Sequence, residues 1–103
     1  MRTIVTIRHG DIPEALKTRA TSVMERLARL AVRPTSAHVT FGSEHQRATV
    51  EIVLNAARGA VHVAGAEGPD PRTALDRASA KLRRQLDKHV TAPRRRARKT
   101  AAR

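Results

Sequence analysis

The 103-residue sequence has no cysteine, no tryptophan and no tyrosine, and Phe41 is its only aromatic residue. Without cysteine the chain can form neither a disulfide nor a thiolate site, which is consistent with a reducing cytoplasm. The shortage of aromatic residues also restricts nucleic-acid recognition, because modules that read single strands stack bases on exposed aromatic side chains. Alternation of apolar and polar residues places Phe41 in the core. A nucleic acid could therefore be recognised only by its shape and its phosphates.

The sequence also lacks a long apolar run and the common catalytic motifs. No stretch approaches about 18 apolar residues, so we expect no membrane-spanning helix and no signal peptide. A phosphate loop, a nucleophile elbow and the spacing of a metal-binding histidine pair are all absent. The histidines are scattered, and alternation predicts that His38 and His62 lie on the solvent side of their strands. We therefore expect no enzyme, no metal site and no cofactor.

Positive charge dominates what is present. Lysine and arginine total 21 against nine acidic residues, which gives a formal net charge of +12. Residues 1–90 contain all nine acids and 15 of the cations, whereas residues 91–103 contain six cations and no acid. We interpret 1–90 as one α+β domain and 91–103 as a basic tail that is disordered when free. This charge favours a polyanion as the partner.

The first 30 residues predict a strand followed by a helix. The β-branched segment 2–8 is typical of a strand. Asp11 is a candidate N-cap, and Glu14 stands three residues later, as a capping box requires. Apolar residues then recur every three or four positions from about Ile12 to about Leu30, which indicates a helix with one buried face.

Three more strands and a second helix should follow. Alternating apolar residues predict strands at 36–42, 46–54 and 60–66, and a second helix begins near Arg72. The predicted fold is a two-layer β-α-β-β-β-α sandwich of the α+β class, with a four-stranded sheet and two helices packed on one face. It has the α-β-β-β-α order of double-stranded RNA-binding domains with one extra strand in front.

The second helix carries two different stripes. Its cations are spaced by four, three and four residues, so they lie on one face, and its apolar residues form a second face that should be buried. The cationic stripe is Arg77, Lys81, Arg84 and Lys88, and the apolar stripe is Leu75, Ala78, Leu82 and Leu86. A solvated helix face is the ordinary interpretation of the first stripe.

The first helix has a cationic flank as well, and the two cationic surfaces could merge when both helices pack on the same sheet. Contacts of this kind act on phosphates through charge and give salt-dependent binding with little base specificity. The expected main phosphate contacts are Arg26, Arg29, Arg33, Arg77, Lys81, Arg84 and Lys88. Secondary candidates are Arg8 and His9 at the end of the first strand and Arg94, Arg95 and Arg96 in the tail.

Several short patterns occur in the same order as in a known family. They are TIVTIRH at 3–9, MERL at 24–27, SAHV at 36–39, VEIVL at 50–54, the strand around His62, DPRTALD at 70–76 and KLRRQL at 81–86. By these patterns, residues 2–90 resemble the short form of the bacterial ribosome hibernation promoting factor family, also called ribosome-associated inhibitors. Two positions depart from the family pattern: Arg72 stands near the place of an aromatic residue, and Arg83 replaces a glutamate. Long members add a C-terminal dimerisation domain, and a basic tail stands in its place here.

The resemblance implies a non-catalytic factor that regulates translation under stress or in stationary phase. Such a factor binds the RNA of the small ribosomal subunit in the channel for mRNA and tRNA and blocks the A and P sites. The resemblance further implies a cytoplasmic, ribosome-associated protein that is a monomer when free and binds neither cofactor nor membrane. One alternative is a packaging protein that coats nucleic acid without a defined site, and a small enzyme is a third and much less favoured interpretation.

Overall fold

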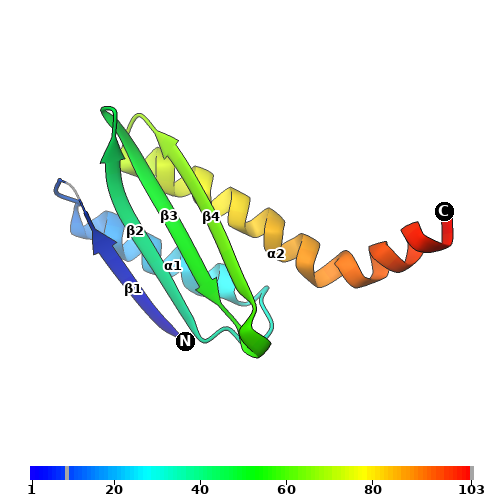
Figure 1. Cartoon of the computed structure of the whole chain (residues 1–103). Coiled ribbons are helices and arrows are strands. Elements are labelled where there is room, and N and C mark those ends of the chain that lie inside the picture. Colours follow the sequence, from blue (N-terminus) through cyan, green and yellow to red (C-terminus); the bar gives the residue numbers. More distant parts are fainter. Residues whose placement is uncertain (9, 103) are drawn as a thin grey trace.

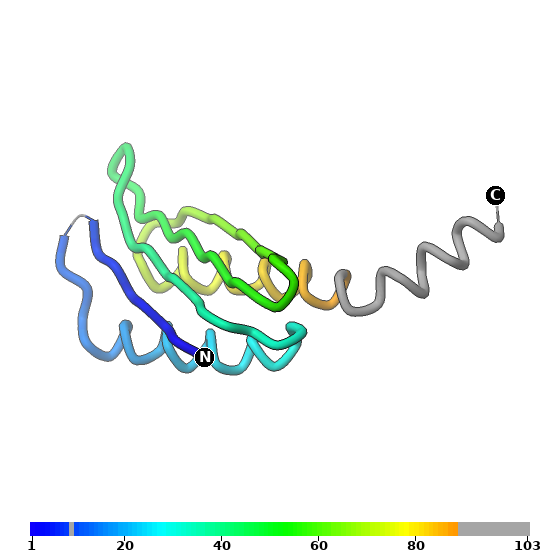
Figure 2. The backbone as a smooth tube through the Cα atoms, turned by 60° about the horizontal axis from the view of Figure 1, so that its bottom comes forward, coloured from blue at the N-terminus to red at the C-terminus, as the bar shows by residue number. Residues whose placement is uncertain are grey.

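The structure, a computed structural model, describes the backbone of residues 1–8 and 10–102 and the side chains of residues 1–8 and 10–88. Both helices lie on the same face of one four-stranded sheet, and the other face is bare (Figure 1; Figure 2). The predicted α+β class and β-α-β-β-β-α order are confirmed. The elements are β1 (Arg2–Ile7), α1 (Glu14–Ala28), β2 (Ser36–Glu44), β3 (Arg47–Asn55), the short turn η1 (Ala57–Gly59), β4 (Val61–Gly68) and α2 (Pro71–Ala102).

The strands are arranged in sequence order, β1-β2-β3-β4. β1 is parallel to β2, and this pairing requires a long crossover connection, which α1 supplies. The other two pairs are antiparallel. The register aligns Val5, Val39, Ile52 and Ala64 in one row across the sheet, on the face that the helices cover.

Each helix covers its own half of the sheet: α1 contacts β1, and α2 contacts β3 and β4. The apolar stripe predicted for the second helix is buried as expected, with every member at most 1% exposed. Phe41 is also buried, as predicted. No helix in the described part of the chain has both the length and the apolarity that a membrane crossing needs.

The start of α1 differs from the prediction. Pro13 is the N-cap residue (φ −59°, ψ 146°), and no side chain caps the helix, so the capping box expected from Asp11 and Glu14 is wrong. The reason is local: proline disfavours the helical conformation of the residue before it, so Ile12 cannot begin the helix. The helix instead begins at the residue after Pro13, whose φ is already close to the helical value.

The start of α2 has a side-chain cap. One carboxylate oxygen of Asp70 accepts a hydrogen bond from the backbone N–H of Thr73 (2.8 Å), and the other accepts one from the Thr73 hydroxyl (3.0 Å). Both bonds lower the pKa of Asp70, and the bond from the backbone N–H of Thr73 has the larger effect. The bonds favour the ionised carboxylate. The cap therefore stabilises the helix fully at pH values above the ordinary pKa of aspartate, and it weakens as the pH falls through the lowered pKa of Asp70.

His62 does not lie on the solvent side of its strand, and that prediction is wrong. It is only 8% exposed, whereas Val61 and Val63 are 55% and 48% exposed. The pairing of β4 with β3 decides this, because His62 stands opposite the fully buried Leu54. Alternation favoured the opposite phase, with Val61 and Val63 inward, and the pairing with β3 overrides it.

Candidate nucleic-acid interface

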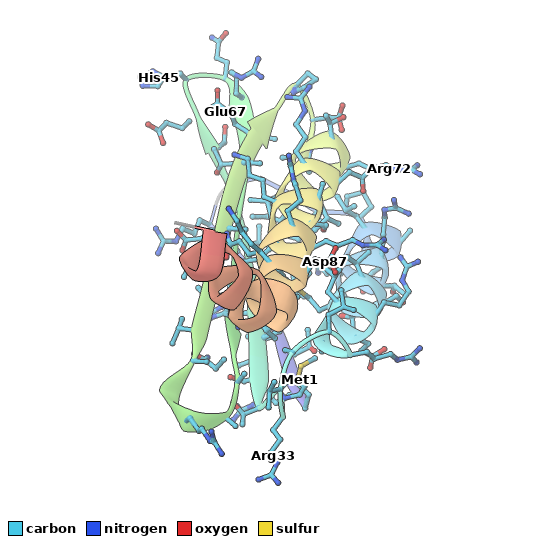
Figure 3. The ribbon with its side chains drawn as sticks, turned by 90° about the vertical axis from the view of Figure 1, so that its right-hand side faces the viewer. Met1, Arg33, His45, Glu67, Arg72 and Asp87 are labelled. Carbon is cyan, nitrogen blue, oxygen red and sulfur yellow. The ribbon has the colours of Figure 1, made fainter. Side chains whose placement is uncertain are left out.

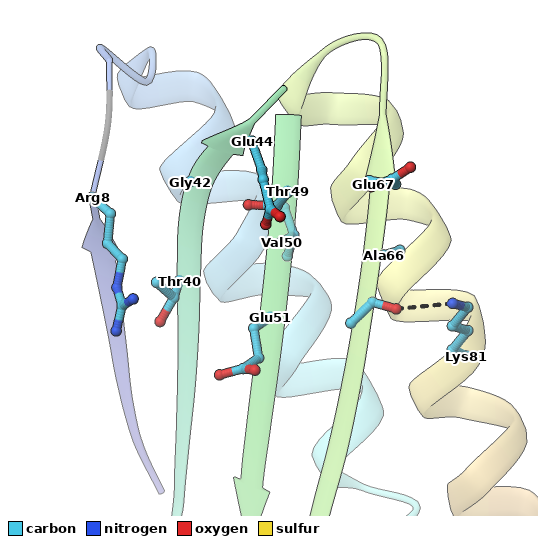
Figure 4. A pocket seen from close by; sticks show the side chains of 11 residues that line it. Arg8, Thr40, Gly42, Glu44, Thr49, Val50, Glu51, Ala66, Glu67 and Lys81 are labelled. Atoms are coloured by element: carbon cyan, nitrogen blue, oxygen red, sulfur yellow. Dashed lines mark hydrogen bonds between the residues drawn. The ribbon is translucent and has the colours of Figure 1, made fainter. Parts of the chain in front are cut away.

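Two members of the cationic stripe of α2, Arg77 and Lys81, lie against the outer edge of β4. Three side chains spaced by four residues donate hydrogen bonds to three alternate backbone carbonyls of the strand. These side chains form what we call the edge ladder: Arg77 Nη1 to Glu67 O (3.0 Å), Lys81 Nζ to Gly65 O (2.9 Å) and Gln85 Nε2 to Val63 O (2.7 Å). Figure 4 shows the Lys81 bond.

The regularity of the ladder follows from helix and strand dimensions. Four residues of an α-helix advance about 6.0 Å, and two residues of a strand advance about 6.6 Å. Every fourth residue of α2 therefore meets every second carbonyl of β4. An outer strand with unpaired carbonyls is a template for pairing with other chains, and charged side chains are a common protection against it. Arg77 and Lys81 thus have a structural role in addition to the predicted phosphate role.

We expect Gln85→Ala to lower the free energy of unfolding by about 0.5–1.5 kcal/mol, because the carbonyl of Val63 loses its donor. Lys88→Ala is the control: it shortens an exposed side chain of the same helix that is not part of the ladder, and surface changes of this kind stay within about 0.5 kcal/mol. Urea unfolding of both variants measures the difference. Equal losses would contradict a stabilising ladder.

A second cationic surface lies between the helices. Arg26 of α1, the C-cap residue Arg29 and Arg83 of α2 line a groove of about 520 Å³, together with Arg19 and Asp76. The Arg19 guanidinium donates two hydrogen bonds to one carboxylate oxygen of Asp76, at 2.9 and 3.3 Å, which joins α1 to α2 across the groove. This interhelix groove therefore carries four arginines against one aspartate.

Ser79 adds a polar atom to the same groove. Its hydroxyl oxygen is buried and has no hydrogen-bond partner within the described residues. Arg83 also lines the groove, although it was not among the expected phosphate contacts. Its Nε lies 4.0 Å from Asp87 Oδ2, and both side chains are largely exposed. The helical phase that Arg83 shares with Ser79 and Asp76 was the signal that could have identified it.

The predicted cations are therefore distributed over more than one surface. Arg26 and Arg29 lie in the interhelix groove, whereas Arg77 and Lys81 turn to the β4 edge. Arg84 and Lys88 are exposed on α2, and Arg84 Nε donates to Ala80 O of its own helix at 3.4 Å. The structure separates the two stripes that we expected to merge, because α2 packs with one flank toward β4 and the other toward α1.

Arg33 leaves the helix entirely. Bonds from residues 29, 30 and 31 to carbonyls three positions back tighten the end of α1, and Arg33 follows with φ 49° in the connection to β2. Helical phase is therefore not kept to this residue. Arg33 and Arg58 line the same pocket, and this pocket is separate from the interhelix groove.

Arg8 lies on the bare face of the sheet, where three glutamates line the same depression (Figure 4). Lys81 of the edge ladder lines the same depression, and the carboxylates make this face a poor match for phosphate. His9 lies outside the described residues, and the side chains of Arg94, Arg95 and Arg96 lie outside the described side chains. Within the described residues, no group of three or more histidines and acids could hold a metal ion.

Comparison with known proteins gives a consistent match. The family model described as sigma 54 modulation protein / S30EA ribosomal protein matches residues 3–94. A ribosomal subunit interface protein from Coxiella burnetii has 22% sequence identity and a TM-score of 0.73, with 86% of this chain and 97% of that chain covered. The N-terminal domain of Protein Y from Thermus thermophilus has 23% identity and a TM-score of 0.71, with 84% and 94% covered. No curated protein sequence matches this chain. At such identities the two structures establish a shared fold.

Proposed function

Because the chain belongs to the sigma 54 modulation protein / S30EA ribosomal protein family, we propose that it is a non-catalytic ribosome hibernation factor. It binds the RNA of the small ribosomal subunit in the channel for mRNA and tRNA, and it blocks the A and P sites there. The protein is cytoplasmic and ribosome-associated, and it is a monomer when free. Residues 1–90 form the binding domain, and the basic segment 91–103 adds charge to it.

The observation that carries the proposal is the interhelix groove, where arginines from two helices face the same space. Arginine presents a planar fork of donors that fits phosphate oxygens, and its charge is permanent. The Asp76 carboxylate fixes Arg19 at 2.9 Å, and Arg83 makes only an exposed 4.0 Å pair with Asp87, so Arg26, Arg29 and Arg83 can meet external anions. A groove with this excess of positive charge is suited to a strand of RNA phosphates.

Recognition proceeds by shape and charge. The only aromatic side chain, Phe41, is 1% exposed and cannot stack on a base. Binding therefore depends on phosphate neutralisation and counterion release, and it weakens as the salt concentration rises. The bound domain inhibits by occupying space that mRNA and tRNA need, so no chemical step is required.

The remaining cations contribute according to their positions. Arg84 and Lys88 extend the positive surface along α2, and Arg77 and Lys81 add charge from the edge ladder. Arg8, His9 and the tail residues Arg94, Arg95 and Arg96 stay secondary contacts of the proposal. Arg33 acts at a separate place on the surface.

Sedimentation of the tagged full chain through a sucrose gradient of stationary-phase lysate tests this function. We expect the protein to move with small subunits and whole ribosomes and to be released as salt is raised. Treatment of a parallel sample with nuclease that degrades DNA and free RNA should not alter the position. A protein spread over DNA and soluble RNA would instead indicate a packaging function.

A further inference from the structure

Two arginines occupy a backbone conformation that arginine rarely adopts. Arg33, between α1 and β2, has φ 49°, and Arg58, in the turn between β3 and β4, has φ 62°. The left-handed region places Cβ close to the following carbonyl, so ordinary side chains avoid it and glycine is the usual occupant. Such residues persist only where surrounding structure imposes the conformation, and they are frequent at functional sites.

Hydrogen bonds hold the two loops together. The backbone N–H of Ala57 donates to Val32 O (3.1 Å), directly beside both arginines. The backbone N–H of Thr35 donates to Asn55 O (2.8 Å), and the Thr35 hydroxyl donates to the same oxygen (3.2 Å). The two connections thus form one platform at the end of the sheet, and Figure 3 places Arg33 at the end opposite His45.

The platform encloses a pocket of about 670 Å³ that both arginines line. Val32 and three alanines supply the apolar part of its wall, and the buried His62 lies at its side. Val32 is 59% exposed, which is high for a large apolar side chain. Among the described side chains no carboxylate lines the pocket, in contrast to the interhelix groove, which has Asp76, and to the depression at Arg8.

We propose that this loop pocket, defined by Arg33 and Arg58, binds one nucleotide unit of unpaired RNA. The two guanidinium groups hold the phosphate, because nothing on the pocket wall neutralises them. The base packs on the apolar wall at Val32, beside the phosphate that the two arginines hold. The inference rests on the proposed function, since it adds a second RNA contact at the end of the same domain.

A binding experiment on the full chain tests the pocket. Six-nucleotide single-stranded oligouridylate is titrated into isotope-labelled protein, and the backbone amide signals are followed by NMR. We expect the signals of residues 32–34 and 57–60 to shift with oligouridylate and to shift little with inorganic phosphate at the same concentration. Arg33→Gln/Arg58→Gln should abolish the shifts. A control, Arg2→Gln/Arg47→Gln, removes the same charge from outside the pocket and should preserve them.

Glycine variants separate binding from folding. Arg33→Gly/Arg58→Gly permits the left-handed backbone, so its melting temperature should be unchanged or higher, while oligouridylate binding falls at least about tenfold. Equal shifts with phosphate and oligouridylate, or equal loss in the pocket and control variants, would overturn the inference. The two proposals fail separately: wild-type protein that shifts at the pocket but does not bind small subunits refutes only the ribosomal function. Protein that binds subunits without pocket shifts refutes only the pocket.

Discussion

Reversing three charges in the interhelix groove, with Arg26→Glu, Arg29→Glu and Arg83→Glu combined, should reduce binding to small ribosomal subunits by at least about 100-fold. All three side chains are exposed, so the fold should survive. The loss follows from removing phosphate contacts and adding repulsion at the same places. If each arginine meets one phosphate, the slope of log affinity against log salt should become shallower by about three units.

A charge-matched variant distinguishes the groove from overall charge. Arg2→Glu, Arg47→Glu and Arg72→Glu lower the net charge by the same amount at exposed positions outside the groove. Filter binding or light scattering at one fixed salt concentration compares the two triple variants. If both lose affinity equally, binding depends on net charge alone and the groove is not the site.

Leu82→Ala should produce the largest loss of stability, about 2–5 kcal/mol, because it empties space at the centre of the core. Leu82 is fully buried on the face of α2 that packs on the sheet. Domains of this size have a total free energy of unfolding of about 5–15 kcal/mol. The variant should therefore melt well below the parent protein, and a fraction of it should be unfolded at physiological temperature.

Leu30→Ala makes the same chemical change at a partly exposed position beyond the end of α1. We expect a loss of about 1 kcal/mol or less there, because less apolar area leaves the core. Denaturant unfolding monitored by circular dichroism measures both. A small loss for Leu82, comparable to that for Leu30, would mean that the buried stripe of α2 has been placed on the wrong residues.

Local chemistry explains most of what could be predicted before the fold was known. The period of the apolar residues identifies a helix or a strand because side chains repeat every 3.6 or every two residues. The buried stripe of α2 and the core position of Phe41 both follow from this rule. The error at Asp11 was also local, since the effect of Pro13 on its neighbour was already present in the sequence.

The candidate surface could be predicted only in part. Arg26 and Arg29 lie in a cationic groove, as their positions on one flank of the first helix suggested. Arg83, which lines the same groove, comes from α2. Arg33 could join this flank only if the helical phase were kept beyond the predicted end near Leu30, but α1 ends at Ala28 and Arg33 has φ 49°. Nothing in the sequence was a reason to select Arg58 as a binding residue, because a single arginine in a short turn is common. Only the fold brings it to the same pocket as Arg33.

The sequence by itself therefore determined the order of elements, the apolar faces and the excess of positive charge, because these depend on neighbours along the chain. Only the tertiary structure decided how the charges are grouped. The strand order puts β4 at the edge beside α2, so Arg77 and Lys81 bond to its carbonyls. The pairing of β4 with β3 likewise turned His62 inward. Contacts between segments distant in the chain carry no local period, and they appear only when the layers pack.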